Sequence, residues 1–422
     1  DARTQFSALI SGYPKSQYRD EALFQRAQFE IEQSNYAVAI SDLTRLINEG
    51  SQSGSRFLPY AYERRAASNY NLKEYDKTIA DYEAVIKQFP SHPVARQVLL
   101  PLQEALSVAK RSEEYDQYLA MVTNANPGGK DLEVINFESA KNQYYNQQYA
   151  KAITSFSTFL TTYPSSAKLA EARFFVAESH YRLTEYDKAL AIYNELSVDP
   201  ASPNANKIAG RIAEIQFKQG QYANAVTSYH KVERFASSKK DFYTAWSGLM
   251  ESFYLLAQYD SVTTYANLIL EKGNVNAGAQ NKASLYLGKA AMAKGDYETA
   301  KDEFLNTLNT ARDEYGAEAK YRIGEIFSLN KQYKQSNETL VGISSSPEFS
   351  AYDEWVGKSF LLLADNYLAQ GDSFNAKATL ESLITNNFPL QYIRDTAAEK
   401  LKKFKADELK EQQKVKSDTT GK

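Results

Sequence analysis

The stretch LAEARFFVAESHYRLTEYDKALAIYNELSVDP, residues 169–200, decides the fold. Its first half has small, apolar or aromatic residues at the spacing of one helical face, at Ala172, Val176, His180 and Leu183. After a short turn its second half has the same spacing, at Ala189, Ile192, Tyr193 and Leu196. Each helix is too short to be stable alone and has an apolar stripe to bury. The stretch therefore predicts an αα-hairpin of two antiparallel helices.

The same hairpin recurs along the whole chain, and an aromatic residue in the turn marks almost every copy. The marks are Tyr36, Tyr75, Tyr115, Tyr149, Tyr186, Tyr222, Tyr259, Tyr297 and Tyr333, and Ser373 lies in the same register. A small residue often lies nine positions before the mark and another three after it, and a large apolar residue often lies seven after it. Ten hairpins in phase predict an α-solenoid, in which each repeat buries its apolar face on its neighbours.

The order of a small residue, a turn aromatic, an alanine, a second aromatic and a proline resembles the tetratricopeptide repeat. The resemblance covers nearly the full chain and implies an all-α, right-handed superhelix of about ten helix hairpins plus terminal helices. The long repeats that end in Tyr-Pro-x-Ser, as at Tyr163–Ser166, are similar to those of bacterial cell-envelope proteins with many tetratricopeptide repeats. The hairpins marked by Tyr115 and Tyr259 have Leu106 and Met250 at the small position. We expect looser packing or a changed angle there.

The run Asn126-Pro127-Gly128-Gly129 is the strongest break in the helical pattern. It predicts an N-terminal sub-array over residues 1–126, a C-terminal sub-array over residues 131–389, and a hinge between them. We expect residues 390–413 to form a capping helix, because a polar outer face is what the end of a solenoid requires. We expect residues 414–422 to be a disordered tail.

The composition excludes several classes of function. A formal net charge of −3 over 422 residues gives little attraction for nucleic acid or an anionic membrane. Without cysteine there is no disulfide, thiolate nucleophile or Cys-ligated metal. No stretch of eighteen apolar residues is present, so we expect no transmembrane segment in this chain. Residues Asp1–Pro14 have the pattern of a second helix without its first, and we expect the native protein to extend upstream of Asp1.

Motifs that are similar to active sites are better explained by the repeat. Gly371–Phe374 is similar to the start of a Gly-Asp-Ser esterase, but the last histidine is His230 and the motif occupies an interhelix turn. Ser165–Lys168 has Ser-x-x-Lys spacing, but no Lys-Thr-Gly follows. His92, His180 and His230 fall in different repeats without a His-x-x-x-His pair. We therefore expect no enzymatic activity, no cofactor and no metal.

The remaining candidate is a binding surface. In tetratricopeptide proteins the first helix of each hairpin lines the concave face, and the resemblance implies exposed positions 12, 8, 5 and 4 residues before the mark. Rings interleaved with charges at these positions suit peptide capture. The predicted groove residues are Phe137, Lys141, Tyr144, Tyr145, Phe174, Glu178, Tyr181, Arg182, Glu214, Phe217, Lys218, Glu251 and Tyr254. The alternative is that many of these rings pack helix against helix.

The resemblance implies a non-enzymatic protein–protein interaction scaffold of a bacterial cell envelope, in the periplasm or on the periplasmic face of the outer membrane. Its partner would be a protein or peptide, and not nucleic acid. No hairpin has the Lys and Asn of the family's carboxylate clamp at positions −12 and −8, so a chaperone-clamp role is disfavoured. Two alternatives stay open: a regulatory module of a larger cytoplasmic protein, and a surface that binds glycan or peptidoglycan.

Overall fold

The computed structural model describes residues 2–126, 131–197, 204–272 and 275–420. These residues form helices joined by short turns, without a strand. The chain divides by its packing into two units, Asp1–Leu196 and Ser197–Lys422. The break and hinge that we predicted at residues 127–130 lie outside the described residues, and the two predicted sub-arrays stay a prediction.

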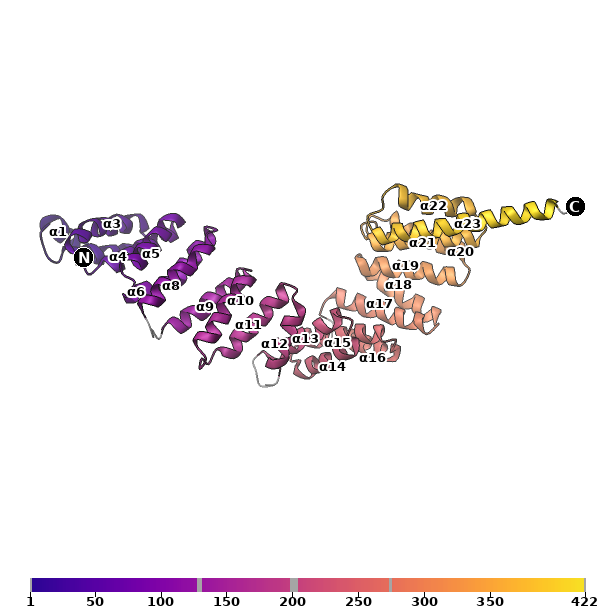
Figure 1. Ribbon diagram of the computed structural model, residues 1–422, viewed down its shortest axis with the longest axis horizontal. Coiled ribbons are helices and arrows are strands. Elements are labelled where there is room, and N and C mark those ends of the chain that lie inside the picture. Colours follow the sequence, from indigo (N-terminus) through magenta and orange to yellow (C-terminus); the bar gives the residue numbers. More distant parts are fainter. Residues whose placement is uncertain (1, 127–130, 198–203, 273–274, 421–422) are drawn as a thin grey trace. The chain divides into compact units, whose positions relative to one another are not determined.

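The first unit is a series of helix hairpins that begins with a lone helix (Figure 1). Its elements are α1 Ala2–Gly12, α2 Arg19–Glu32, α3 Tyr36–Ser53, α4 Leu58–Asn71, α5 Tyr75–Gln88, α6 Pro93–Gln97, α7 Leu99–Val108, the 3₁₀ turn η1 Ser112–Glu114, α8 Tyr115–Ala125, α9 Asp131–Tyr145, α10 Tyr149–Thr162, α11 Leu169–Arg182 and α12 Tyr186–Leu196. In the hairpin marked by Tyr115, the first helix is split into α6 and α7. Pro101 lies in the first turn of α7, where its missing N–H removes no helical hydrogen bond.

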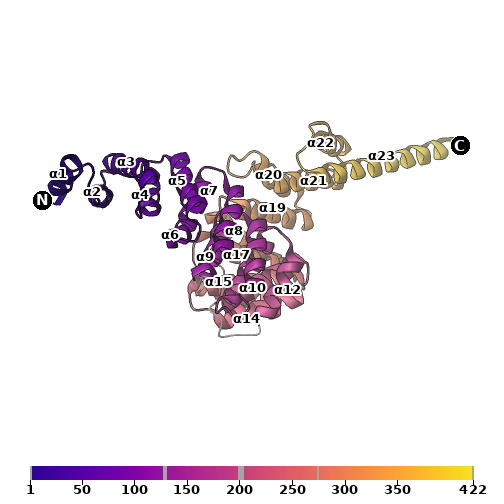
Figure 2. The ribbon, with the colours of Figure 1, turned by 60° about the vertical axis from the view of Figure 1, so that its left-hand side comes forward.

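The second unit has five regular hairpins and a long last helix. Its elements are α13 Ala205–Lys218, α14 Tyr222–Phe235, α15 Lys239–Leu255, α16 Tyr259–Glu271, α17 Ala277–Ala293, α18 Tyr297–Thr310, α19 Glu314–Leu329, α20 Tyr333–Ser344, α21 Asp353–Ala369, α22 Ser373–Thr385 and α23 Gln391–Thr420. α23 contacts α21 and α22 and continues past them (Figure 2). α23 covers the predicted capping segment, and the structure describes it as helix to Thr420, so the disordered tail that we expect over residues 414–422 stays a prediction.

The turn within each hairpin has a fixed backbone geometry. All ten predicted marks are the first residue of the second helix, which confirms the register. In nine of these turns the residue two positions before the mark has a positive φ, at Ser34, Lys73, Gln147, Thr184, Gly220, Ala257, Gly295, Lys331 and Gly371. Glycine adopts this left-handed conformation most easily. Six of the nine positions hold a residue other than glycine. The positive φ of these turns therefore cannot be predicted from the positions of glycine in the sequence.

The small residue nine positions before the mark lets the two helices of a hairpin approach closely. A Cβ added at Gly288 would lie 2.6 Å from the ring of Phe304, the large residue seven positions after the mark. At Gly324 it would lie 2.7 Å from Leu340, which has the same register. The small and large positions predicted from the sequence therefore pack against each other within one hairpin.

Each of the first two complete hairpins of the first unit has an arginine–aspartate pair between its two helices. The Arg26 guanidinium donates to both carboxylate oxygens of Asp42, at 2.8 and 2.6 Å, and to the Ser7 hydroxyl of the preceding α1 at 2.9 Å. The next hairpin repeats these contacts in the same register, with Arg65, Asp81 and Thr44. Each arginine thus forms a bidentate pair between the two helices of its own hairpin. It also contacts the preceding element, which is α1 for Arg26 and α3 for Arg65.

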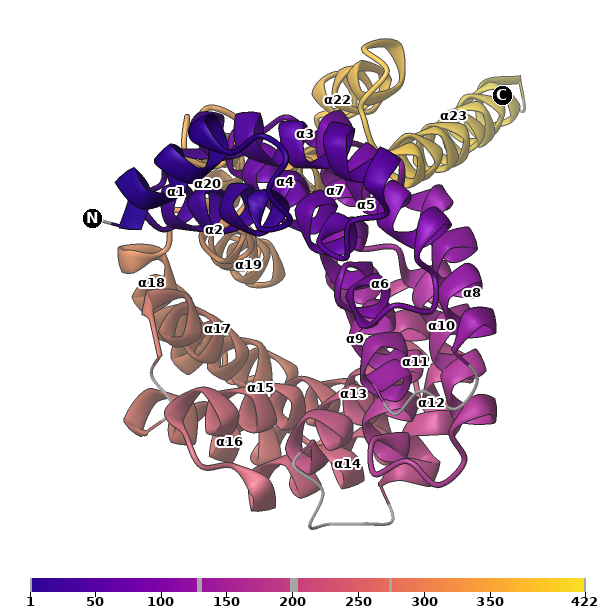
Figure 3. The same ribbon diagram turned by 90° about the vertical axis from the view of Figure 1, so that its left-hand side faces the viewer.

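Where the hairpins stack, each second helix packs against the next first helix, and successive first helices also contact one another. In the second unit α13 contacts α15, α15 contacts α17, α17 contacts α19, and α19 contacts α21. Figure 3 shows α15 and α17 on the inner side of this unit's curve and α14 and α16 on its outer side. The first helices therefore line the concave side, as expected for this type of solenoid.

Candidate binding surface

The thirteen predicted groove residues lie on the first helices α9, α11, α13 and α15, but five of them are not exposed. Phe137 and Glu178 are fully buried, and Phe174, Tyr144 and Tyr181 are 5%, 8% and 9% exposed. Our prediction that these positions are open to a partner is wrong, and the alternative of helix-to-helix packing holds for them. Whether the set as a whole binds a partner stays a prediction.

A ring contact that recurs in five of the hairpins explains part of this burial. The aromatic residue five positions before the mark packs against the ring of the mark itself, with ring centres 5.5–6.1 Å apart. The pairs are Tyr70–Tyr75, Tyr144–Tyr149, Tyr181–Tyr186, Phe217–Tyr222 and Tyr254–Tyr259. Offset and edge contacts of this kind are favourable between aromatic rings. The ring at this position therefore stabilises the turn of its own hairpin.

In several hairpins the charged residue eight positions before the mark pairs with the next hairpin. Its partner lies fifteen positions before the following mark, so the ion pair joins two first helices. The pairs are Lys141–Glu171 at 3.5 Å, Glu251–Lys282 at 2.5 Å, Lys289–Glu318 at 3.2 Å and, on α21 and α23, Asp365–Lys400 at 2.6 Å. Two of the predicted groove charges, Lys141 and Glu251, therefore form part of this ladder between hairpins.

Glu178 occupies the same register but is enclosed. Its carboxylate accepts hydrogen bonds from the hydroxyl of Tyr193 at 2.5 Å and from that of Tyr144 at 3.3 Å. A buried carboxylate is costly unless it is hydrogen-bonded, and these phenols provide that. Glu178 thus fixes the contact between its own hairpin and α9.

The remaining predicted residues are at least partly accessible. Tyr145 is the most exposed ring of the set, at 63%, while Arg182 and Lys218 are also exposed. Glu214 accepts from Arg211 at 3.0 Å and pairs with Lys218 at 2.9 Å, both within α13. Lys141, Glu214, Phe217, Glu251 and Tyr254 are half-buried.

Further along the second unit, cations lie over aromatic rings on successive first helices. The Lys289 ammonium lies 4.9 Å from the ring centre of Tyr254 and 4.4 Å from that of Tyr286. The remaining contacts are Arg322 over Tyr321 and Trp355, at 5.6 and 5.7 Å, and Lys358 over Trp355, at 4.5 Å. Such cation–π contacts stabilise both groups. We call the side of α15, α17, α19 and α21 that carries these groups the first-helix face.

Burial and ion pairing shift the pKa values of side chains on this face. Burial raises the pKa of Tyr321 to about 12, and it also raises the pKa of Tyr286. Burial lowers the pKa of Lys289, although its partner Glu318 opposes this effect. The tyrosines on this face are therefore neutral hydrogen-bonding groups at physiological pH. We did not predict that α17, α19 and α21 contribute to a binding surface. The spacing of Tyr286 and Lys289, three residues apart, indicates a ring and a cation on one helical face and could have been used.

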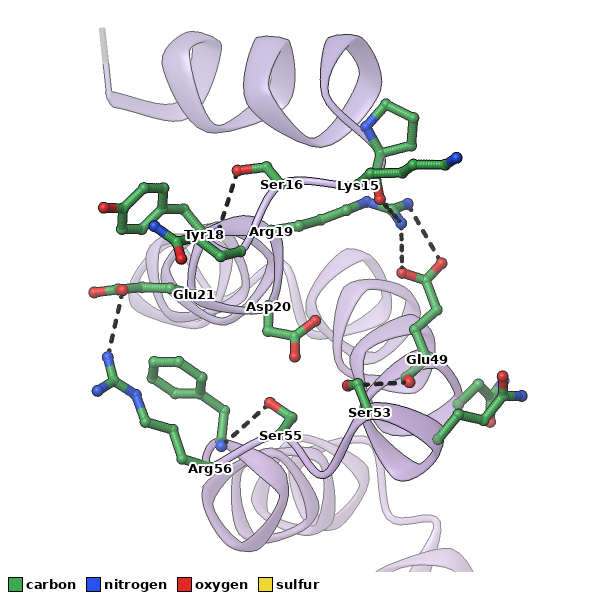
Figure 4. Close-up of a pocket in the computed structure, with 15 residues that line it drawn as sticks. Lys15, Ser16, Tyr18, Arg19, Asp20, Glu21, Glu49, Ser53, Ser55 and Arg56 are labelled. Atoms are coloured by element: carbon green, nitrogen blue, oxygen red, sulfur yellow. Dashed lines mark hydrogen bonds and ion pairs between the residues drawn. The ribbon is translucent and has the colours of Figure 1, made fainter.

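Accessible cavities in the first unit were also not predicted, and two of them differ clearly in size and lining. The larger, of about 800 Å³, lies between the loop that follows α1 and the loop that follows α3 (Figure 4). Its charges are largely paired with one another, since Arg19 contacts Glu49 at 2.7 Å and Arg56 contacts Glu21 at 3.5 Å. Its lining is polar on all sides and close to neutral. The Tyr-Pro-x-Ser pattern, here Tyr13–Ser16, marks one of its two loops in the sequence.

The smaller cavity, of about 340 Å³, lies between α7 and α9, and we call it the Tyr145 pocket. Its lining residues are Leu100, Pro101, Gln103 and Glu104 from α7, Asn142 and Tyr145 from α9, and Asn146 from the turn that follows α9. The Gln103 amide donates to the carbonyl and to the hydroxyl of Ser139, both at 2.9 Å, and its oxygen accepts from the Asn142 amide at 3.2 Å. These bonds hold the two helices, and hence the two walls of the pocket, together.

No group of three or more His, Cys, Asp or Glu side chains able to hold a metal ion is found among the described residues. Within the same part of the chain, no helix combines the length and the apolar character needed to cross a membrane.

Comparison with known families agrees with the hairpin register. A family model described as tetratricopeptide repeat matches residues 137–206, and a second with the same description matches residues 60–92, 211–238 and 358–389. The chain contains tetratricopeptide repeats over these residues. A comparison of this tetratricopeptide-repeat chain with curated proteins finds no match.

Solved structures similar to this tetratricopeptide-repeat protein share little sequence with it. The C-terminal part of a TPR repeat-containing protein from Cytophaga hutchinsonii is 16% identical, covers 70% of this chain and 98% of its own, and gives a TM-score of 0.39. A tetratricopeptide repeat protein from Parabacteroides merdae is 14% identical, with 64% and 98% covered and a TM-score of 0.33. A chain of the APC/C hetero-tetramer Cut9–Hcn1 is 13% identical, with 95% and 92% covered and a TM-score of 0.40.

Proposed function

We propose that this chain is a non-enzymatic scaffold of a bacterial cell envelope, which binds a protein partner on its first-helix face. The tetratricopeptide fold is consistent with protein–protein interaction in general. The periplasm, or the periplasmic face of the outer membrane, is supported by the long repeats that end in Tyr-Pro-x-Ser and by the absence of cysteine.

The observation that supports the binding surface is the series of half-buried rings on α15, α17 and α19, each covered by a cation. Tyr254, Tyr286 and Tyr321 keep part of their surface exposed, and Lys289 and Arg322 lie against them. Rings that are already fixed lose little conformational freedom on binding, and Tyr, Trp and Arg dominate the energetics of protein interfaces. The ion pairs between first helices hold this surface in place before a partner arrives.

Charge reversal on the first-helix face tests the proposal. Lys358 lies over Trp355 and pairs with Glu354 at 2.6 Å, so Lys358→Glu removes a cation from this face. Lys301→Glu is the matched control, because Lys301 pairs with Glu298 at 3.0 Å on the second helix α18. Both variants would be used to capture, from envelope extracts, the partner that the wild-type protein retains.

We expect Lys358→Glu to weaken capture by about tenfold and Lys301→Glu to leave it unchanged. Equal capture by both variants would exclude the first-helix face as the binding surface. Fractionation of native cells tests the location separately. Recovery of the protein in the cytosol alone would contradict the envelope assignment and favour the regulatory alternative.

A further inference from the structure

Glu104 differs from the carboxylates of the ladder between hairpins. Glu171, Glu251, Glu318 and Asp365 each form an ion pair with a lysine of a neighbouring first helix. Glu104 is exposed on α7, and within the described residues it forms no ion pair. The Tyr145 pocket is thus lined by one carboxylate that no cation of the described chain neutralises.

The orientation of this carboxylate is fixed by a neighbouring tyrosine. The Tyr70 hydroxyl donates to Oε1 of Glu104 at 2.6 Å. A carboxylate has about four acceptor sites, so Oε2 and the second lone pair of Oε1 remain for a donor from outside the chain. Glu104 is therefore held in position and still able to accept hydrogen bonds.

The opposite wall of the pocket provides a ring and amides. Tyr145 is 63% exposed and is supported from behind by the rings of Tyr144 and Phe175, at 5.5 and 6.1 Å. The Asn142 amide nitrogen donates to Gln103, which leaves its carbonyl oxygen as an acceptor. The pocket therefore combines a negative charge, an exposed aromatic surface and a neutral acceptor.

We propose that the Tyr145 pocket receives an arginine side chain of a partner protein segment. This inference goes beyond the proposed function, because it places a contact in the first unit, outside the first-helix face of the second unit. The guanidinium stacks on the Tyr145 ring, donates to Glu104, and donates to the Asn142 carbonyl oxygen. The charge of arginine complements that of Glu104, the only ionised side chain among the described residues of the lining.

Arginine fits this lining better than lysine does. Its planar fork carries five donors, it stacks on aromatic faces, and it is more weakly hydrated than an ammonium group. A carboxylate on one wall and a ring on the other match a flat cation with donors at its edge. The volume of about 340 Å³ also exceeds that of one side chain, so part of the partner's main chain enters with it.

A short peptide tests the inference without the native partner. The full chain would be titrated with acetyl-Gly-Arg-Gly-amide, and binding followed by saturation-transfer NMR. The same peptide with citrulline is the matched ligand control, because citrulline has the shape of arginine without its charge. Peptides with lysine and norleucine complete the series.

We expect the arginine peptide to bind the wild-type chain at least about tenfold more tightly than the citrulline, lysine or norleucine peptide. Glu104→Gln keeps the shape and the bond from Tyr70, and should lower affinity for the arginine peptide by about tenfold. Tyr145→Leu should also lower it, whereas Tyr145→Phe should not. Glu113→Gln makes the same change of charge outside the pocket lining and should have no effect.

Equal binding of the arginine and citrulline peptides, or of arginine by wild type and Glu104→Gln, would overturn the inference. Equal binding of the lysine peptide would overturn the assignment to arginine. These results are independent of the scaffold proposal, which stands or falls with capture of a partner by the wild-type protein. A scaffold that captures its partner and shows no arginine preference would remove only this inference.

Discussion

Replacing Gly248 with alanine should destabilise the second unit, although alanine is the better helix former. Gly248 lies within α15, where alanine is favoured over glycine by about 1 kcal/mol. A Cβ at this position would lie 2.3 Å from two atoms of the Tyr229 ring and 2.5 Å from a third. Carbon atoms pack at about 3.5–4.0 Å, so the ring would have to retreat by roughly 1 Å. Steric overlap and helix propensity therefore act in opposite directions at this site.

The cost of steric overlap should exceed the gain in helix propensity, because the Tyr229 ring has no free space to enter. Tyr229 is 8% exposed and belongs to the same core cluster as Leu249, Met250 and Val262. Overpacking of a filled core costs about 1–3 kcal/mol. A separation of only 2.3 Å from two ring atoms places Gly248→Ala in the upper part of this range, at about 2–3 kcal/mol. After the gain of about 1 kcal/mol in helix propensity, we expect a net loss of about 1–2 kcal/mol in the free energy of local unfolding.

Amide hydrogen exchange of α14 and α15 is the appropriate assay, because long repeat arrays need not unfold in one step. A loss of 1–2 kcal/mol should speed exchange by about five- to thirtyfold. Gly210→Ala is the matched control, since Gly210 lies within α13 and a Cβ there meets nothing within 4 Å. That control should slow exchange in its own helix. If Gly248→Ala slows exchange as much as Gly210→Ala does, the close approach of α14 and α15 is not as described.

Three further substitutions follow from the packing. Thr184 has a φ of 60° at the turn position where Gly220 has a φ of 74°. Thr184→Gly should therefore raise stability by up to about 1 kcal/mol, because a left-handed backbone is costly for threonine. The reverse change, Gly220→Thr, should lower the melting temperature. Glu318→Gln should cost about 2 kcal/mol in a denaturant titration, because it weakens pairing with both Lys289 and Arg322, whereas Glu298→Gln, at an 82% exposed side chain, should have little effect. Tyr144→Ala should cost about 3 kcal/mol and Tyr145→Ala under about 0.5 kcal/mol, and equal melting of these neighbours would contradict the burial assigned to them.

The hairpin register could be predicted from the sequence because it depends on local periodicity. The mark begins every second helix, and the small residue before it and the large residue after it pack together, as at Gly324 and Leu340. The backbone of the turn was not readable, since Thr184 and Ala257 adopt a positive φ that their side chains do not favour. Packing of the whole hairpin overrides this local preference.

The candidate surface was harder to predict, because exposure depends on the next hairpin. Tyr144 and Tyr145 are neighbours with the same side chain, yet they are 8% and 63% exposed. Tyr144 lies five positions before the mark, where a ring packs against the mark, and Tyr145 lies four before it, but the resemblance implied that both positions are exposed. The arginine–aspartate pairs of the first unit have a sequence pattern from which we made no prediction. Arg26–Asp42 and Arg65–Asp81 share a spacing of 16 residues in consecutive repeats.

Photo-crosslinking in native cells tests most directly whether the first-helix face binds a partner. A photoreactive phenylalanine analogue would replace Tyr254 on α15, and in a second strain Leu305 on α18, which is 41% exposed. We expect a discrete protein adduct from position 254 and none from position 305. An adduct from position 305 alone would show that the partner binds the second helices and would contradict the proposed function.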